Sequence, residues 1–135
     1  MRAHIFDHTR PVVIEGEGGA LTMEPLPQFH GDIISLGFRI GGLAYCPDIS
    51  GFPDATAERL RGLEMLVIDA LQYNTHPSHL SLGQALEWIE RLAPSNAVLT
   101  HMHVPLDYAT VMAETPDKVV PAHDGMVIEI PYESA

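Results

Sequence analysis

The chain is poor in cysteine and has no long hydrophobic run, and each shortage excludes a class of protein. Its single cysteine, Cys46, rules out an internal disulfide and a cysteine-rich zinc cluster. No stretch approaches the roughly 20 consecutive apolar residues of a membrane span. The first residues also lack the apolar core of a secretory signal peptide. We therefore expect a cytoplasmic protein that does not interact with membranes.

Positive charge is scarce as well. Only 7 lysines and arginines stand against 18 aspartates and glutamates, which gives a formal net charge of -11 at pH 7. Proteins that bind nucleic acids neutralise phosphates with lysine and arginine, so this chain is not expected to bind nucleic acid. A small substrate that carries phosphate stays open, because bound cations would reverse the local field.

The sequence does contain enough apolar residues for one packed core. Hydrophobic residues make up 46% of the 135 residues, and this length limits the chain to a single domain. Aromatic residues account for only 7% of the chain. Leucine, isoleucine, valine and alanine must therefore do most of the packing.

The hydrophobic pattern predicts strands first, and strands alternating with helices afterwards. Strands are expected at 3–6, 11–15, 20–25, 33–40, 43–46, 65–69, 96–100, 118–122 and 126–130, and helices at 54–62, 81–93 and 106–115. Ser81 and Gln84 form a capping-box sequence at the start of the strongest helix. This order is typical of an α/β fold with a mixed sheet and helices on one face. The other face would be uncovered, which predicts association through it.

Histidines and one aspartate gather in loops next to strand ends, where α/β folds place their ligands. They are His30, Asp48, His76, His79, His101 and His103. Imidazole and carboxylate together suit zinc, iron or manganese. A carboxylate that bridges two metals about 3.5–4 Å apart is a common hydrolytic arrangement. The pattern indicates a metal-dependent hydrolase site, and loop histidines of an ordinary soluble domain are the alternative.

Other residues give weaker signals. His4 and His8 flank Asp7 unevenly, so we interpret them as part of a strand and a turn. Cys46 is better explained as a small buried residue than as a nucleophile. Asp69 ends a buried strand and could either accept a hydrogen bond from a ligand histidine or cap the following loop. His123 is a weak candidate for a substrate contact.

From about residue 21 to 130, the sequence resembles the phosphodiesterase-type branch of the metallo-β-lactamase fold hydrolases. This branch includes the phosphoribosyl cyclic phosphate phosphodiesterases and their tRNase Z relatives. The segments that carry the resemblance are LPQFH (26–30), SLGFR (35–39), LAYCPDIS (43–50), HPSHLS (76–81), LTH (99–101) and DGM (124–126). Each segment is weakly diagnostic by itself, and their combined order is specific.

The resemblance implies roles for the loop residues. His30, Asp48 and His101 would be metal ligands, and Asp48 would bridge two divalent ions, zinc or manganese. His101 is favoured over His103 as the last ligand. His79 would be the catalytic residue beside a small phosphodiester or nucleotide-like substrate. A thiolesterase or lactamase of the same fold is a weaker alternative, because the surroundings of His79 resemble the phosphodiesterases.

The sequence departs from the family in one large respect. The main metal motif of the family, HxHxDH, is absent, and residues 4–8 do not fit it. We therefore expect residues 1–135 to form a single partial domain, equivalent to the C-terminal half of the αββα layered fold. The alternative is a non-catalytic remnant or interaction module that associates through an exposed sheet face. Its partner would be a second copy or a missing N-terminal half.

Overall fold

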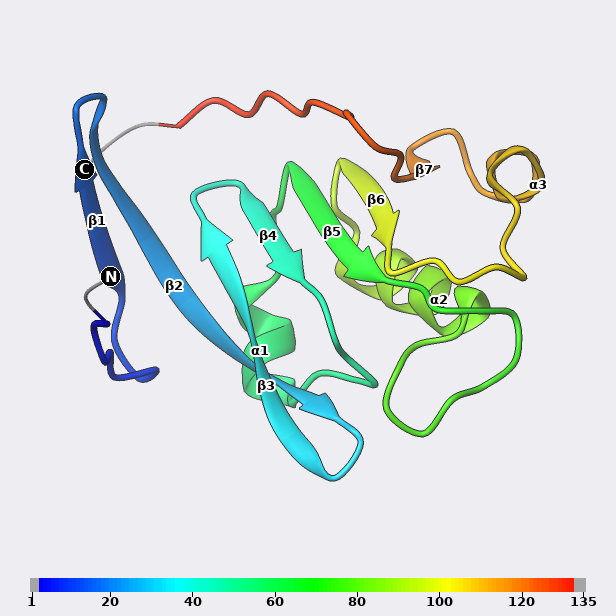
Figure 1. Ribbon diagram of the computed structural model, residues 1–135, viewed down its shortest axis with the longest axis horizontal. Coiled ribbons are helices and arrows are strands. Elements are labelled where there is room, and N and C mark those ends of the chain that lie inside the picture. Colours follow the sequence, from blue (N-terminus) through cyan, green and yellow to red (C-terminus); the bar gives the residue numbers. More distant parts are fainter. Residues whose placement is uncertain (1–2, 133–135) are drawn as a thin grey trace.

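The structure is a computed structural model that describes residues 3–132 (Figure 1). Its elements are β1 (Val12–Gly16), β2 (Gly19–His30), β3 (Ile33–Ile40), β4 (Leu43–Cys46), α1 (Asp54–Arg59), β5 (Met65–Asp69), α2 (Leu82–Leu92), β6 (Asn96–Thr100), α3 (Tyr108–Glu114) and β7 (Val119–Pro121). Within this range, none of the helices is long and apolar enough to cross a membrane.

All seven strands form one sheet, in which their spatial order is their order along the chain. Strands β1 to β4 pair antiparallel, whereas β4 to β7 pair parallel. A parallel pair needs a crossover connection, and α1, α2 and α3 lie in the three crossovers. The mixed sheet confirms the predicted α/β class.

The hydrophobic core lies between the sheet and helices α1 and α2, which Figure 1 shows behind the strands. One row of cross-strand partners on this face is fully buried: Ala44, Leu66, Ala97 and Val119. Helix α2 adds Ala85, Ile89 and Leu92, which follow the spacing of one helical face. The predicted capping box is present, with Gln84 N 3.2 Å from Ser81 Oγ and Ser81 N 3.0 Å from Gln84 Oε1.

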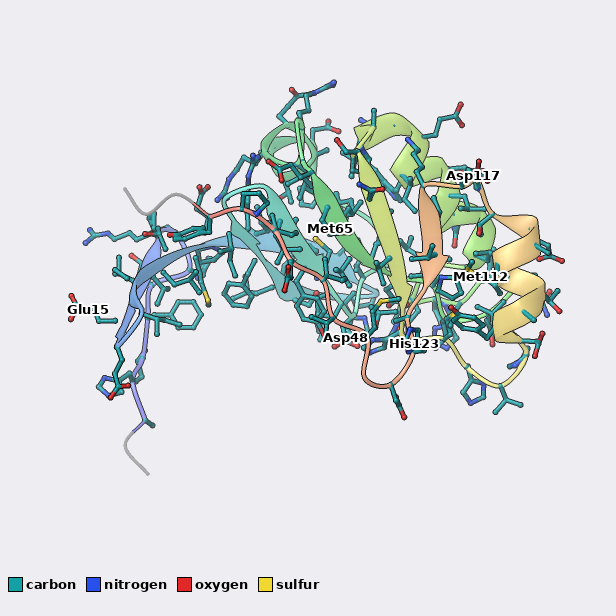
Figure 2. All side chains as sticks on the ribbon, turned by 90° about the horizontal axis from the view of Figure 1, so that it is seen from above. Glu15, Asp48, Met65, Met112, Asp117 and His123 are labelled. Carbon is teal, nitrogen blue, oxygen red and sulfur yellow. The ribbon has the colours of Figure 1, made fainter. Side chains whose placement is uncertain are left out.

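The opposite face of the sheet carries a second apolar row that is less well covered. Its cross-strand partners are Phe38, Tyr45, Val67, Val98 and Val120. Tyr45 remains 44% exposed, and of this row only Val98 is buried. Residues 122–132 run back from β7 to the β1–β2 hairpin on this side of the sheet (Figures 1 and 2). Tyr132 ends this path by accepting a hydrogen bond from Thr22 N at 2.9 Å.

The structure corrects several predicted elements. No strand forms at 3–6 or at 126–130, because neither segment pairs with another strand and apolar alternation cannot supply a partner. The strand expected at 20–25 continues to His30, since its second half pairs with β3. The first helix is shorter than predicted: it begins at Asp54, directly after Pro53, and ends at Arg59.

Candidate functional site

The candidate site lies at the edge of the sheet where β2, β4, β5 and β6 end. These four strands run in the same direction, because β2 and β4 are both antiparallel to β3 and the last three strands are parallel. Their carboxyl ends therefore meet at one edge. His30 ends β2, and Asp48, Asp69 and His101 lie at or just after the ends of β4, β5 and β6.

Three of the predicted residues form a group that could hold a metal ion. One ligand atom each from His30, Asp48 and His79 lies within 4.8 Å of the other two. His101 joins through Asp48, since its Nε2 atom lies 3.1 Å from Asp48 Oδ1. The Asp48 side chain is 49% exposed and so is open to a ligand. The structure thus brings together four residues that the sequence placed at separate loops.

The His30 ring is held so that one nitrogen stays available. Its Nδ1 atom lies 2.6 Å from the Ser78 carbonyl oxygen. A carbonyl can only accept a hydrogen bond, so Nδ1 carries the proton and Nε2 keeps a lone pair. Metal-binding histidines usually have this arrangement, with the second ring nitrogen bonded to a carbonyl or carboxylate. Ser78 was not singled out from the sequence, because its carbonyl reaches His30 only in the folded chain.

Asp69 is fully buried and links two parts of the site. Its Oδ2 atom lies 2.5 Å from His79 Nδ1 and accepts a second hydrogen bond from Ile49 N at 3.2 Å. Asp69 therefore fixes the His79 ring and the backbone that follows Asp48. Of the two roles left open by the sequence, it has that of a carboxylate supporting a site histidine rather than that of a loop cap.

The His79 ring is surrounded by the other imidazoles of the site. Its centroid lies 4.8 Å from that of His30, which is nearly perpendicular, and 5.7 Å from that of His101, which is stacked. The His76 ring lies 5.3 Å away. Because Asp69 holds Nδ1, Nε2 is the nitrogen through which His79 can act on a ligand.

Asp48 and His101 both adopt a left-handed backbone conformation, with φ of 50° and 62°. In the described part of the chain, the one other non-glycine residue of this kind is Ala93, at the end of α2. Such conformations are uncommon, although aspartate and histidine adopt them more readily than most residues, and they cluster at functional sites. His103 has no such backbone, is exposed, and uses its amide to bond the Leu71 carbonyl at 2.8 Å.

The remaining histidines stay outside the group. Within residues 3–132, the metal-compatible cluster does not include His4, His8, His103 or His123. Of the strand and turn expected at residues 4–8, only the turn is present, and Asp7 supports it by accepting a hydrogen bond from Thr9 N at 2.9 Å. The His123 ring packs near that of Tyr108, with 6.0 Å between their centroids.

Cys46 is buried in the core, as predicted, and its reactivity can be tested. Burial raises the pKa of the Cys46 thiol from 9.0 to about 12. Because the thiolate is the nucleophile, we expect iodoacetamide to leave Cys46 unmodified in the folded protein at mildly alkaline pH. Urea-unfolded protein should react fully, and mass spectrometry measures both. Stoichiometric modification of the folded chain would contradict the burial.

The same shift has a consequence for stability. The unfolded thiol loses its proton near pH 9.0, whereas the folded thiol keeps it until about pH 12. Across this range the folded state binds more protons than the unfolded state, so the contribution of Cys46 to folding stability falls as the pH rises.

The fold and the site together define a class, that of α/β proteins with a histidine- and aspartate-lined site at the carboxyl edge of a layered sheet. Residues 1–102 match the family model described as the beta-lactamase superfamily domain, and the chain therefore belongs to this superfamily of hydrolases. The metallo-β-lactamase fold that the resemblance implied is confirmed.

Two solved structures illustrate the relation. A crystal structure of a new diphosphatase from the PhnP family is 32% identical, with a TM-score of 0.88 over 96% of this chain. Zinc-bound PqqB from Methylobacterium extorquens is 18% identical, with a TM-score of 0.59 over 88% of this chain, and shows likeness of fold only. This chain covers 49% of the diphosphatase and 50% of PqqB.

A curated relative carries a different name. The octanoyltransferase of Porphyromonas gingivalis strain W83 is 36% identical over 89 residues, which is 64% of this chain. The chain spans only 18% of that protein. That name therefore describes a much longer protein.

Proposed function

We propose that this chain supplies part of the active site of a metal-dependent phosphodiesterase. The observation that carries the proposal is the group formed by His30, Asp48 and His79, whose ligand atoms lie within 4.8 Å of one another. Support also comes from the 32% identical structure, which is named as a diphosphatase. Its substrate bond, like a phosphodiester, is attacked at phosphorus.

The donor atoms fit a divalent ion. Two imidazoles and a carboxylate match the ligands that zinc and manganese take in proteins. We assign His30, Asp48 and His101 as ligands, and Asp48 would be the ligand shared by two ions; its contact with His101 and its proximity to His30 support this assignment. Bound divalent ions would activate a water molecule and neutralise charge on the phosphate.

His79 is assigned the proton transfer. Asp69 accepts a hydrogen bond from His79 Nδ1, so Nε2 is left to exchange a proton with the substrate. A protonated Nε2 can donate to the leaving oxygen as the bond to phosphorus breaks. The buried Asp69 carboxylate balances the positive charge of that imidazolium. Under this proposal, the chain would supply both metal ligands and a positioned acid.

The rest of a dinuclear site would come from elsewhere. This chain spans about half of the diphosphatase, and its sequence contains no HxHxDH segment. We propose that residues 1–135 are one half of the domain. The partly exposed row of Phe38, Tyr45 and Val67 would pack against the other half.

The same row supports the second candidate, an interaction module without catalysis. A homodimer could also cover these side chains, since large exposed apolar patches mark association sites. Under this candidate, the loop residues have no ligand to hold, so their replacement would leave association unchanged.

The test compares Asp48→Ala with Asp117→Ala, a matched exposed aspartate before β7 that Figure 2 shows well away from Asp48. Binding of zinc and manganese is measured by equilibrium dialysis followed by metal analysis. Hydrolysis is measured with bis(p-nitrophenyl) phosphate as the substrate. We expect Asp48→Ala to weaken metal binding by more than about tenfold, because a ligand matters at least as much as its supporting residues. Asp117→Ala should bind as the wild type does.

Two results would contradict the proposal. Metal binding unaffected by Asp48→Ala would place the ions elsewhere. Saturable self-association with no specific metal binding in the wild type would favour the interaction module.

A further inference from the structure

A buried glutamine and a partly buried serine lie beneath the loop that carries Asp48. Gln28 and Ser35 are cross-strand partners on β2 and β3, and Gln28 is 0% exposed. Gln28 Nε2 lies 2.6 Å from the Pro47 carbonyl oxygen and 3.1 Å from Ser35 Oγ. Ser35 Oγ in turn lies 2.7 Å from the Asp48 carbonyl oxygen.

The hydrogen atoms in this network have only one consistent arrangement. The Ser35 hydroxyl has one proton, and it must go to the Asp48 carbonyl, which can only accept. Ser35 Oγ then accepts one amide proton of Gln28, and the Pro47 carbonyl accepts the other. Every donor is used, so two consecutive loop carbonyls are held by side chains from neighbouring strands.

The network holds a part of the backbone that adopts an uncommon conformation. Asp48 has a φ of 50°, and its peptide neighbours have no regular strand partner. The next amide, Ile49 N, donates to the buried Asp69 Oδ2 at 3.2 Å. Side chains therefore hold the backbone of three successive residues and keep Asp48 turned towards His30 and His101.

A purely structural role does not account for Gln28. Its Oε1 atom is buried and has no hydrogen-bond partner in the described chain, which is costly for an amide. β3 also makes room for it with glycine: a Cβ at Gly37 would lie 2.6 Å from Gln28 Oε1 and 2.8 Å from Tyr45 O. An apolar residue of similar volume would pack without this cost, so the two amide donors are what the site requires.

We infer that Gln28 and Ser35 are positioning residues that act through Asp48, by fixing the loop that presents its carboxylate. The consequence for metal binding rests on the proposed function. The consequence for the loop backbone does not rest on it. One experiment can therefore test the positioning role of Gln28 and Ser35 separately from the proposed function.

The experiment compares Ser35→Ala with a matched control, Thr56→Val. Thr56 is 3% exposed, and its hydroxyl also donates to a backbone carbonyl, that of Pro27, at 2.7 Å. Each substitution removes one such bond, but only Ser35 touches the loop. Amide hydrogen exchange of Ile49 is measured by NMR relative to the Leu66 amide of the central sheet, and the zinc Kd is measured by chelator competition.

We expect Ser35→Ala to speed Ile49 exchange and to raise the zinc Kd, each by about tenfold relative to Thr56→Val. Ser35→Thr, which keeps the hydroxyl, should restore both values towards wild type. Gln28→Met keeps the length of the side chain and removes its amide donors, so it should also speed Ile49 exchange and raise the zinc Kd. It takes the place of Ser35→Ala if that variant does not fold.

Each outcome decides the inference. The inference would be overturned if the Ile49 amide exchanged no faster in Ser35→Ala and Gln28→Met than in Thr56→Val. This holds whether or not the protein binds metal. Faster exchange with an unchanged zinc Kd would overturn it as well, since the loop would then not govern the ligand. If the wild type binds no zinc, the proposed function fails, and faster Ile49 exchange would still establish the positioning of the loop.

Discussion

Replacement of Asp69 by alanine is expected to lower the free energy of unfolding by about 3 kcal/mol. Asp69 is 0% exposed and accepts hydrogen bonds from His79 Nδ1 and from Ile49 N. Without the carboxylate, both donors lose their acceptor inside the protein. A buried donor left without a partner costs about 1–3 kcal/mol, and His79 is the less costly of the two because it is partly exposed.

Urea unfolding followed by far-ultraviolet circular dichroism measures the loss. Asp107→Ala is the matched control, because Asp107 caps α3 through Thr110 N at 3.0 Å but is exposed. Loss of that cap should cost about 1 kcal/mol. Asp69→Asn keeps one acceptor oxygen and should fall between the two. A loss for Asp69→Ala no greater than that for Asp107→Ala would show that the carboxylate does not hold the site together.

The elements that the sequence predicted well are those whose signal is local. Residues 65–69 and 96–100 are short apolar runs between turn signals, and both became central parallel strands. The capping-box sequence of Ser81 and Gln84 correctly predicted where α2 begins, to within one turn. Residues 126–130 are also rich in apolar side chains but have no neighbouring strand, and a strand needs a partner that sequence alone does not provide.

The site shows the same division between local and tertiary information. The positions of His30, Asp48 and His101 at strand ends could be predicted, because parallel strands bring their carboxyl ends to one edge. The preference for His101 over His103 as a metal ligand stays a prediction; in the structure, His101 contacts Asp48. The Asp69–His79 pair could only be left open, since the folded path of the connection between β5 and α2 decides whether these two side chains meet.

Gln28 and Ser35 were missed as support for the site, although a signal was present. A glutamine between Pro27 and Phe29 interrupts an apolar segment, and a glycine, Gly37, follows two residues after Ser35. In an isolated sequence this looks like ordinary strand-edge polarity. Only the register of β2 against β3 shows that the amide is buried and points its donors at the Asp48 loop.

The second large effect is expected for His79→Ala, which should reduce hydrolysis by about 10²–10⁴-fold, the usual contribution of a positioned acid or base. Zinc affinity should change little, because His30, Asp48 and His101 keep their positions. The reduction should be larger for a phosphodiester with an alcohol leaving group than for bis(p-nitrophenyl) phosphate. Nitrophenolate leaves readily without a proton, whereas an alkoxide does not.

Parallel measurement of kcat, KM and zinc Kd separates the two roles that the geometry allows for His79. Its ligand atom lies within 4.8 Å of those of His30 and Asp48, so it could bind a metal instead of donating a proton. His76→Ala is the matched control, since its ring lies 5.3 Å from that of His79 and does not contact Asp69. A zinc affinity that falls in His79→Ala as far as in Asp48→Ala would make His79 a ligand. An unchanged affinity, with the larger loss on the poorer leaving group, would make it the acid, because only proton donation depends on the basicity of the departing oxygen.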